Sequence, residues 1–175
     1  IIVKEGTQLG GYNTDARGFV RSLVDKLREN NGELKGSYVV MFGAGGVAKP
    51  LAYLLAEHGI RKLQIINRTG SKAADLADEI RKKYGIEAYG NDETVIRGMA
   101  LNLHLRASPQ VIINATDKGS DGKLVEYAAF AETINTNNSD SMTNLRELFR
   151  HHPRLILADV AMTKRGKTRT LELAE

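Results

Sequence analysis

The chain has 175 residues, of which 42% are apolar and 26% charged, and this length and balance predict one globular domain with a buried core. It has no cysteine, which excludes a disulfide framework, thiolate metal ligands and a cysteine nucleophile, and we expect a cytoplasmic protein. The net charge of +4 comes from scattered basic residues without interleaved aromatics, so we expect no nucleic-acid partner. We also expect no membrane partner, because no apolar run approaches the roughly 18 residues of a membrane span.

Helix-like and strand-like segments alternate along the chain. Apolar residues at the spacing i, i+3, i+4 indicate helices, and short continuous apolar runs indicate strands buried on both faces. In chain order they predict a helix at 17–28, a strand at 38–42, a helix at 47–58, a strand at 63–66, a helix at 71–84, a strand at 86–89, a helix at 92–103, a strand at 111–113, helices near 123–134 and 142–151, and a strand at 155–157. This alternation predicts an α/β fold, a doubly wound parallel sheet with right-handed crossovers.

Local signals add detail at three places. The first helix is expected to start at Asp15, because Thr14 or Asp15 stands where an N-cap belongs. The polar residues 135–141 predict a loop. His151 and His152 have no carboxylate or cysteine at ligand spacing, so we expect an exposed helix end there and no metal site.

A glycine-rich turn of the form G-x-G-x-x-A connects the predicted strand 38–42 to the next predicted helix. It consists of Gly43, Ala44, Gly45, Gly46, Val47 and Ala48. The first glycine permits a tight turn, the second lets the backbone approach a diphosphate, and Ala48 allows close packing of the helix on the sheet. The amides at the helix N-terminus can then bind phosphate. The turn therefore predicts a Rossmann-type NAD(P)-binding domain, although a turn without a ligand would have the same pattern.

The end of the second predicted strand indicates which dinucleotide is bound. An NAD enzyme carries Asp or Glu there to bind the adenosine ribose, and that charge would repel a 2′-phosphate. This chain has Asn67, Arg68 and Thr69 instead, and Lys72 lies one helical turn beyond Arg68. A guanidinium can bind the phosphate and stack on adenine. These residues favour NADP as the cofactor, although Arg68 and Lys72 could also be exposed charges at a helix start.

Several segments in the same order resemble the shikimate/quinate dehydrogenase family. They are G-x-N-T-D-x-x-G at residues 11–18, the glycine-rich turn at 43–48, Asn67-Arg68-Thr69, Ile113-Asn114-Ala115-Thr116, and Asp159-Val160 followed by Thr168 and Leu171. The resemblance implies hydride transfer between NADPH and a small-molecule substrate, a hydroxy or keto cyclohexene carboxylate like 3-dehydroshikimate. It also implies roles for individual residues: catalysis by Asp15, substrate binding by Asn13 and Asp15, and cofactor binding by Asn114, Ala115, Thr116, Val160 and Met162.

The chemistry of alcohol oxidation is consistent with a catalytic Asp15. A carboxylate that hydrogen-bonds the alcohol beside an ammonium group can manage the hydroxyl proton and orient the carbon toward the nicotinamide. In the family this ammonium belongs to a lysine of the substrate domain. We therefore expect residues 1–175 to be an NADP-binding domain without its N-terminal substrate domain and C-terminal helix, and to be inactive alone. The sequence leaves a homodimer open.

Three positions depart from the pattern that the resemblance provides. Met162 stands where the family has a tyrosine hydroxyl, Asp117 where it commonly has Ser or Lys, and Ser120 where it commonly has Met. A methionine cannot donate the hydrogen bond of a tyrosine. The departures predict a substrate or a rate different from those of an ordinary shikimate dehydrogenase.

Three other functions fit parts of the sequence. A degenerate relative could bind NADP as a sensor without dehydrogenase activity. A basic nucleic-acid-binding domain would bind DNA with a steep salt dependence and would ignore NADP. Another NADP enzyme, such as a glutamyl-tRNA reductase-like protein, would share the fold, but the Asn13-Thr14-Asp15 segment argues against it.

Overall fold

Five parallel strands form one sheet in the computed structural model, in the order β5-β4-β3-β6-β7. Their bounds are β3 (Tyr38–Phe42), β4 (Lys62–Asn67), β5 (Glu87–Asp92), β6 (Val111–Asn114) and β7 (Ile156–Asp159). The structure describes residues 2–11, 14–96, 109–124, 128–129, 146, 148–150, 152–164 and 166–172. From β3 the chain adds strands outward to β5, and then places β6 and β7 on the opposite side of β3. This order confirms the predicted doubly wound α/β fold of Rossmann type.

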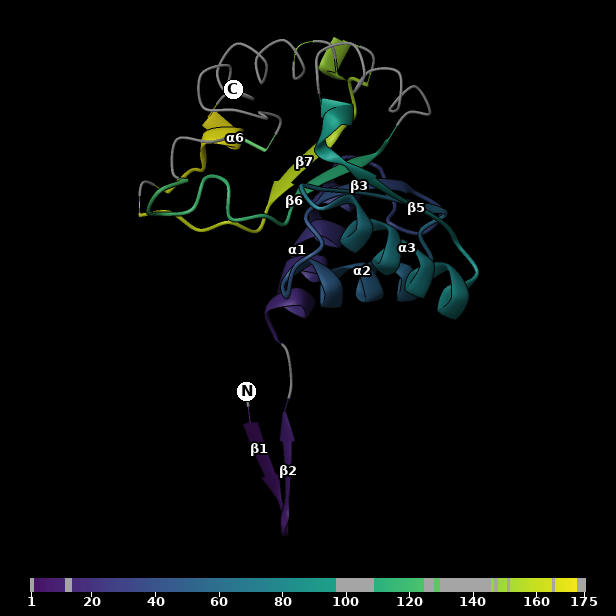
Figure 1. Cartoon of the computed structure of the whole chain (residues 1–175), viewed down its shortest axis with the longest axis vertical. Coiled ribbons are helices and arrows are strands. Elements are labelled where there is room, and N and C mark those ends of the chain that lie inside the picture. The colour runs from purple at the N-terminus through teal and green to yellow at the C-terminus, as the bar shows by residue number, and fades with distance from the viewer. Residues whose placement is uncertain are drawn as a thin grey trace.

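Three helices cover one face of the sheet (Figure 1). They are α1 (Asp15–Glu29), α2 (Ala48–Glu57) and α3 (Gly70–Tyr84). A short 3-10 helix, η1 (Glu93–Ile96), follows β5, and the four-residue helix α6 (Arg169–Glu172) follows β7. The helix α1 starts at Asp15 as predicted, but Thr14, which holds the N-cap position, makes no capping hydrogen bond with its side chain.

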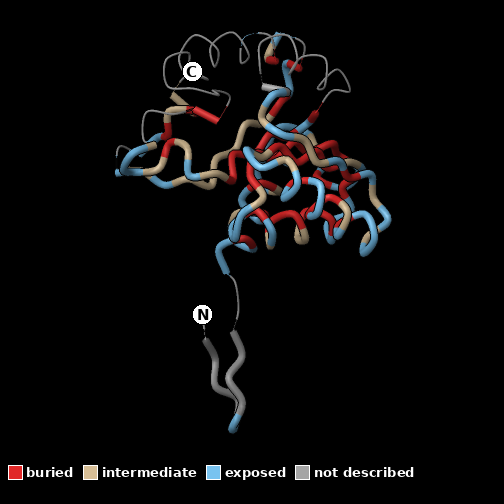
Figure 2. Tube along the Cα trace, viewed as in Figure 1, coloured by how far each residue is buried: buried red, intermediate tan, exposed pale blue. Residues whose placement is uncertain are grey.

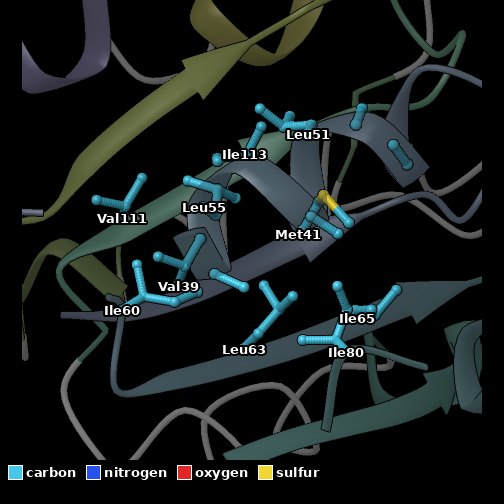
Figure 3. Packing of buried hydrophobic residues seen from close by; sticks show 14 of the residues in the cluster. Val39, Met41, Leu51, Leu55, Ile60, Leu63, Ile65, Ile80, Val111 and Ile113 are labelled. Atoms are coloured by element: carbon cyan, nitrogen blue, oxygen red, sulfur yellow. The ribbon is translucent and has the colours of Figure 1, made fainter. Parts of the chain in front are cut away.

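The core occupies both faces of the sheet, because every residue of the strands β3 and β6 is buried. On the face that α1, α2 and α3 cover, apolar side chains of β3, β4 and β6 pack against α2 and α3, as Figure 3 shows. The labelled members of this cluster are Val39, Met41, Leu51, Leu55, Ile60, Leu63, Ile65, Ile80, Val111 and Ile113. On the other face Tyr38, Val40 and Phe42 pack with Leu148. In Figure 2 the buried residues accordingly concentrate in the sheet and on the inner sides of the helices.

A two-stranded hairpin precedes α1, and the sequence analysis assigned no element there. It consists of β1 (Ile2–Glu5) and β2 (Gln8–Gly11), which pair antiparallel from Ile2 opposite Gly11 to Glu5 opposite Gln8. Figure 1 shows the hairpin extending away from the sheet and its helices.

Two predicted helices are wrong where the structure describes them. Of the helix predicted at 92–103, Asp92 instead ends β5, and η1 follows it. Strand pairing with β4 continues to Asp92, whose carboxylate then accepts a hydrogen bond from the Thr94 amide (2.9 Å), so the chain turns there. Of the helix predicted near 123–134, residues 123, 124, 128 and 129 are not helical. The Leu124 carbonyl accepts a hydrogen bond from the Gly119 amide (2.8 Å), and the Ala129 amide donates to the Thr170 hydroxyl (2.8 Å). The other residues of both segments lie outside the described part.

The prediction of a helix at 142–151 is confirmed at its described residues, 146 and 148–150. The exposed helix end predicted for the two histidines is wrong at His152, which is only 9% exposed. His152 lies in the turn into β7, where its carbonyl accepts a hydrogen bond from the Leu155 amide (3.0 Å), and this tight reversal holds it against the core. His151 and the loop predicted at 135–141 lie outside the described residues.

Candidate dinucleotide site

A cleft of about 600 Å³ lies at the carboxyl edge of the sheet. The segments that follow all five strands line it: residues 43–47, 67–69 with Lys72, Glu93, 115–118 with Ser120 and Leu124, and 160–162. The strand order reverses between β3 and β6, and in doubly wound folds ligands bind at this switch point. The sheet therefore places the cleft where the fold binds dinucleotides.

The glycine-rich turn forms the floor of the cleft. Gly43 has a φ of +112°, a conformation that only glycine adopts readily, and a β-carbon at Gly43 would lie 2.5 Å from the Ala115 carbonyl oxygen. The turn is thus pressed against the end of β6. Gly45 and Gly46 are exposed with open space around them, and no side chain caps the start of α2. Bare amides at a helix N-terminus are suited to a phosphate.

Ala48 supports this turn from below and does not line the cleft. It is fully buried in the core at the first position of α2, as the predicted close packing of helix on sheet requires. Val47, one residue earlier, is 53% exposed and does line the cleft.

Asn67 connects the end of β4 to the glycine-rich turn. Its side-chain oxygen accepts a hydrogen bond from the Ala44 amide (3.2 Å), and its side-chain nitrogen donates to the Thr69 carbonyl (3.0 Å). Asn67 lines the cleft, and both ends of its amide are occupied by these backbone partners. The residue therefore connects the floor of the cleft to its rim at Thr69.

Three side chains that could bind a phosphate stand at the rim beside Asn67. Arg68, Thr69 and Lys72 are exposed and line the cleft. Within the described ranges, neither Arg68 nor Lys72 takes part in an ion pair. Both cations are therefore available to a ligand, and Thr69 adds a hydroxyl.

A buried polar network supports the opposite wall. Asn114 is fully buried and outside the cleft lining, so it acts on the site through its neighbours. Its side-chain nitrogen donates to the Asp159 carboxylate (2.9 Å), and its oxygen accepts from the Thr116 amide (3.1 Å) and hydroxyl (2.6 Å). Asp159 also accepts hydrogen bonds from the Thr168 hydroxyl (2.5 Å) and the Ala161 amide (2.8 Å). The network fixes Thr116 and Ala161, which line the cleft.

Asp159 is expected to make the stability of the fold depend on pH. Burial raises the pKa of its carboxyl above the ordinary value of 3.8, although the hydrogen bonds from Thr168, Asn114 and Ala161 oppose the rise. Because the pKa is higher in the folded state than in the unfolded state, the protonated carboxyl contributes fully to stability at a pH below the unfolded-state pKa. This contribution is lost as the pH rises through the folded-state pKa. The slope for one such group reaches at most about 1.4 kcal/mol per pH unit.

Urea unfolding of the wild type and of Asp159→Asn across the acid range checks this expectation. As the pH rises through this range, the free energy of unfolding of the wild type should decrease more than that of the variant. The same pH dependence in both proteins would contradict the assignment.

An ion pair crosses the cleft between segments that sequence reasoning did not connect. Lys118 Nζ lies 2.9 Å from Glu93 Oε1, and the two side chains are only 13% and 17% exposed. Glu93 falls within the helix that was predicted at 92–103, and Lys118 follows the motif Ile113-Asn114-Ala115-Thr116, so the sequence patterns gave neither residue a role in the site. The rule that residues following parallel strands gather at one edge of the sheet could have found both.

The remaining predicted residues fall into three groups. Ala115, Thr116, Val160 and Met162 line the cleft, as do Asp117 and Ser120. Met162 is 85% exposed at its rim. Asp15 is exposed in the first turn of α1 and does not line the cleft. Asn13 lies outside the described residues.

The described residues contain no group of three or more His, Asp or Glu side chains arranged to hold a metal ion. Among the same residues, none of the helices combines the length and apolar character that a bilayer crossing demands.

The domain has a Rossmann-like fold, as the strand order of the sheet, the glycine-rich turn and the position of the cleft together show. The chain belongs to the shikimate/quinate 5-dehydrogenase family, whose family model matches residues 25–142. The family predicted from the sequence motifs is thereby confirmed.

Curated relatives of the chain carry either cofactor in their names. A shikimate dehydrogenase (NADP(+)) of Desulforamulus reducens is 37% identical over 112 residues, which cover 62% of this chain and 38% of that protein. A quinate/shikimate dehydrogenase (NAD(+)) of Corynebacterium efficiens is 31% identical over 125 residues, 68% of this chain and 39% of that protein. The chain therefore spans less than half the length of these relatives.

Solved structures of the same family share the fold. The shikimate 5-dehydrogenase of Listeria monocytogenes, in complex with shikimate and NAD, has a TM-score of 0.73 at 24% identity, over 99% of this chain and 53% of that one. The quinate dehydrogenase of Corynebacterium glutamicum, in complex with NAD, has a TM-score of 0.66 at 30% identity, over 99% and 52%.

Proposed function

We propose that the chain is the NADP-binding domain of an oxidoreductase that interconverts a hydroxy and a keto cyclohexene carboxylate, like shikimate and 3-dehydroshikimate. The observation that carries the proposal is an arginine without an ion-pair partner in the described residues, Arg68, beside an uncapped helix start that follows a glycine-rich turn. Family membership supports the reaction class, since relatives are named as dehydrogenases of shikimate and quinate. It does not favour a sensor without dehydrogenase activity.

The residues of the cleft fit a phosphorylated dinucleotide. The space above Gly45 and Gly46 and the open amides of α2 suit a diphosphate. Arg68, Thr69 and Lys72 would hold the 2′-phosphate by charge-assisted hydrogen bonds. The cofactor, when bound, would donate the hydride to the keto compound in its reduced form and accept it from the hydroxy compound in its oxidised form. The walls at Thr116 and at residues 160–162 would enclose its nicotinamide half.

We propose that Asp15 accepts the proton of the substrate hydroxyl when the alcohol is oxidised and returns it in the reverse reaction. Asn13 is proposed as a second residue that contacts the substrate. The carboxylate of Asp15 is exposed in the first turn of α1 and therefore accessible to a substrate. It lies outside the cleft, so the complete site needs a partner surface. We propose that a substrate domain provides this surface, together with a lysine beside Asp15.

Isothermal titration of the chain with NADP and with NAD tests the cofactor assignment. We expect tighter binding of NADP, by ten- to hundredfold, because a charge-assisted contact to the 2′-phosphate contributes roughly 1.5 to 3 kcal/mol. Arg68→Ala should remove most of this difference by weakening NADP binding alone. Equal affinities of the wild type for the two dinucleotides would refute the NADP assignment.

A further inference from the structure

The ion pair between Glu93 and Lys118 spans strands that are not neighbours. Glu93 follows β5 and Lys118 follows β6, and β4 and β3 lie between these strands in the sheet. The pair therefore reaches over the carboxyl ends of β4 and β3, and both side chains line the cleft. Because both are less than one-fifth exposed, solvent screens the pair little.

The strand register places Arg68 and Glu93 each one residue beyond the last paired position of two adjacent strands. Asn67 and Asp92 are partners in the pairing of β4 with β5, so the residues that follow them leave the sheet side by side. Neighbouring strands are about 4.8 Å apart. A β-carbon at Gly70 would lie only 3.1 Å from the Asp92 β-carbon, so the start of α3, two residues after Arg68, packs against the end of β5.

Because of this placement, the Glu93 carboxylate can compete with a ligand phosphate for the Arg68 guanidinium. A glutamate and an arginine on adjacent strand ends can form an ion pair, and Arg68 would then offer less of its charge to a ligand phosphate. In the structure the Glu93 carboxylate instead contacts Lys118, and Arg68 has no ion-pair partner among the described residues. Lys118 thus supplies the positive charge that Glu93 would otherwise find in Arg68.

We propose that Lys118 is a specificity-determining residue of the dinucleotide site. It holds the Glu93 carboxylate away from Arg68, so that the guanidinium is available to the additional phosphate of NADP. It also neutralises a negative charge next to that phosphate. The inference rests on the proposed function of the cleft, and it assigns cofactor preference to a residue in the segment after β6, two strands away from the strand that precedes Arg68.

The test compares the affinities for NADP and NAD, measured by isothermal titration of the 175-residue chain, between the wild type and Lys118→Met. We expect the ratio of the two affinities to fall by about tenfold, through weaker NADP binding, because Glu93 then pairs with Arg68. Glu93→Gln alone should keep the preference for NADP, and adding it to Lys118→Met should restore the ratio, since an amide has no charge to compete for Arg68. The double variant separates this role from a structural one, because lost packing of Lys118 would not be rescued.

Lys49→Met is the matched control. It removes the same charge by breaking the Lys49–Glu79 pair (2.8 Å), which is exposed on the surface of α2 and α3, and it should leave the ratio unchanged. A similar fall in Lys49→Met would show an effect of net charge and overturn the inference. An unchanged ratio in Lys118→Met, or an equal loss in the double variant, would also overturn it.

The inference and the proposed function can fail separately. If the wild type binds neither dinucleotide, or binds both equally, the proposed NADP site is wrong. If Arg68→Ala removes the preference while Lys118→Met keeps it, the NADP site stands and only the role of Lys118 is wrong.

Discussion

Replacing Gly43 with alanine is expected to destabilise the fold by about 3 kcal/mol and to abolish dinucleotide binding. A φ of +112° strains any residue with a β-carbon, and that carbon would stand 2.5 Å from the Ala115 carbonyl oxygen, a backbone atom that cannot rotate away. To relieve the contact, the turn must move away from β6. The shift would change the floor of the cleft between its two walls.

Gly45→Ala provides the control, because a β-carbon there meets no atom within 4 Å. We expect this variant to unfold at nearly the wild-type temperature and to lose NADP affinity only because its methyl group occupies space in the cleft. Thermal unfolding and NADP titration of both variants separate the two effects. Wild-type stability of Gly43→Ala would contradict the account of the turn.

Replacing Asp15 with asparagine is expected to lower turnover by about a hundredfold or more, the usual contribution of a general acid or base. An asparagine keeps the size of the side chain but cannot accept the hydroxyl proton. The measurement requires an enzyme that contains this chain together with a substrate domain. Dinucleotide affinity should stay unchanged, since Asp15 lies outside the cleft.

Asp25→Asn is the matched control for this prediction. Asp25 is also an exposed aspartate of α1 and makes only a loose ion pair with Arg28 (3.8 Å). It should leave turnover unaltered. If Asp15→Asn turns over as fast as the wild type, the catalytic role is wrong.

The elements that were predicted well are those whose sequence signals are local. The run of five apolar residues at 38–42 can only be satisfied by burial on both faces, and the structure buries all five in the central strand. The glycine at position 43 is a local signal too, since the backbone conformation it permits is a property of that residue alone.

What was not predicted depends on contacts between distant segments. The Glu93–Lys118 pair joins residues 25 positions apart, through a crossing of the sheet edge that no local pattern encodes. The burial of Asn114 and its hydrogen bond to Asp159 were not predicted either, because Asp159 is 45 positions away in the sequence. His152 was predicted to be exposed at a helix end, yet tertiary packing buries it.

The hydrogen bonds of Asn67 limit which substitutions this chain can accept at the end of β4. Because one amide side chain holds both the Ala44 amide and the Thr69 carbonyl, a carboxylate introduced there to favour NAD would have no hydrogen to offer Thr69. Substitutions at positions 68, 69 and 72 should disturb the structure less, because the side chains there are exposed. If the chain binds NADP as proposed, a change of its preference to NAD is expected to require substitutions at those three positions, with Asn67 left in place.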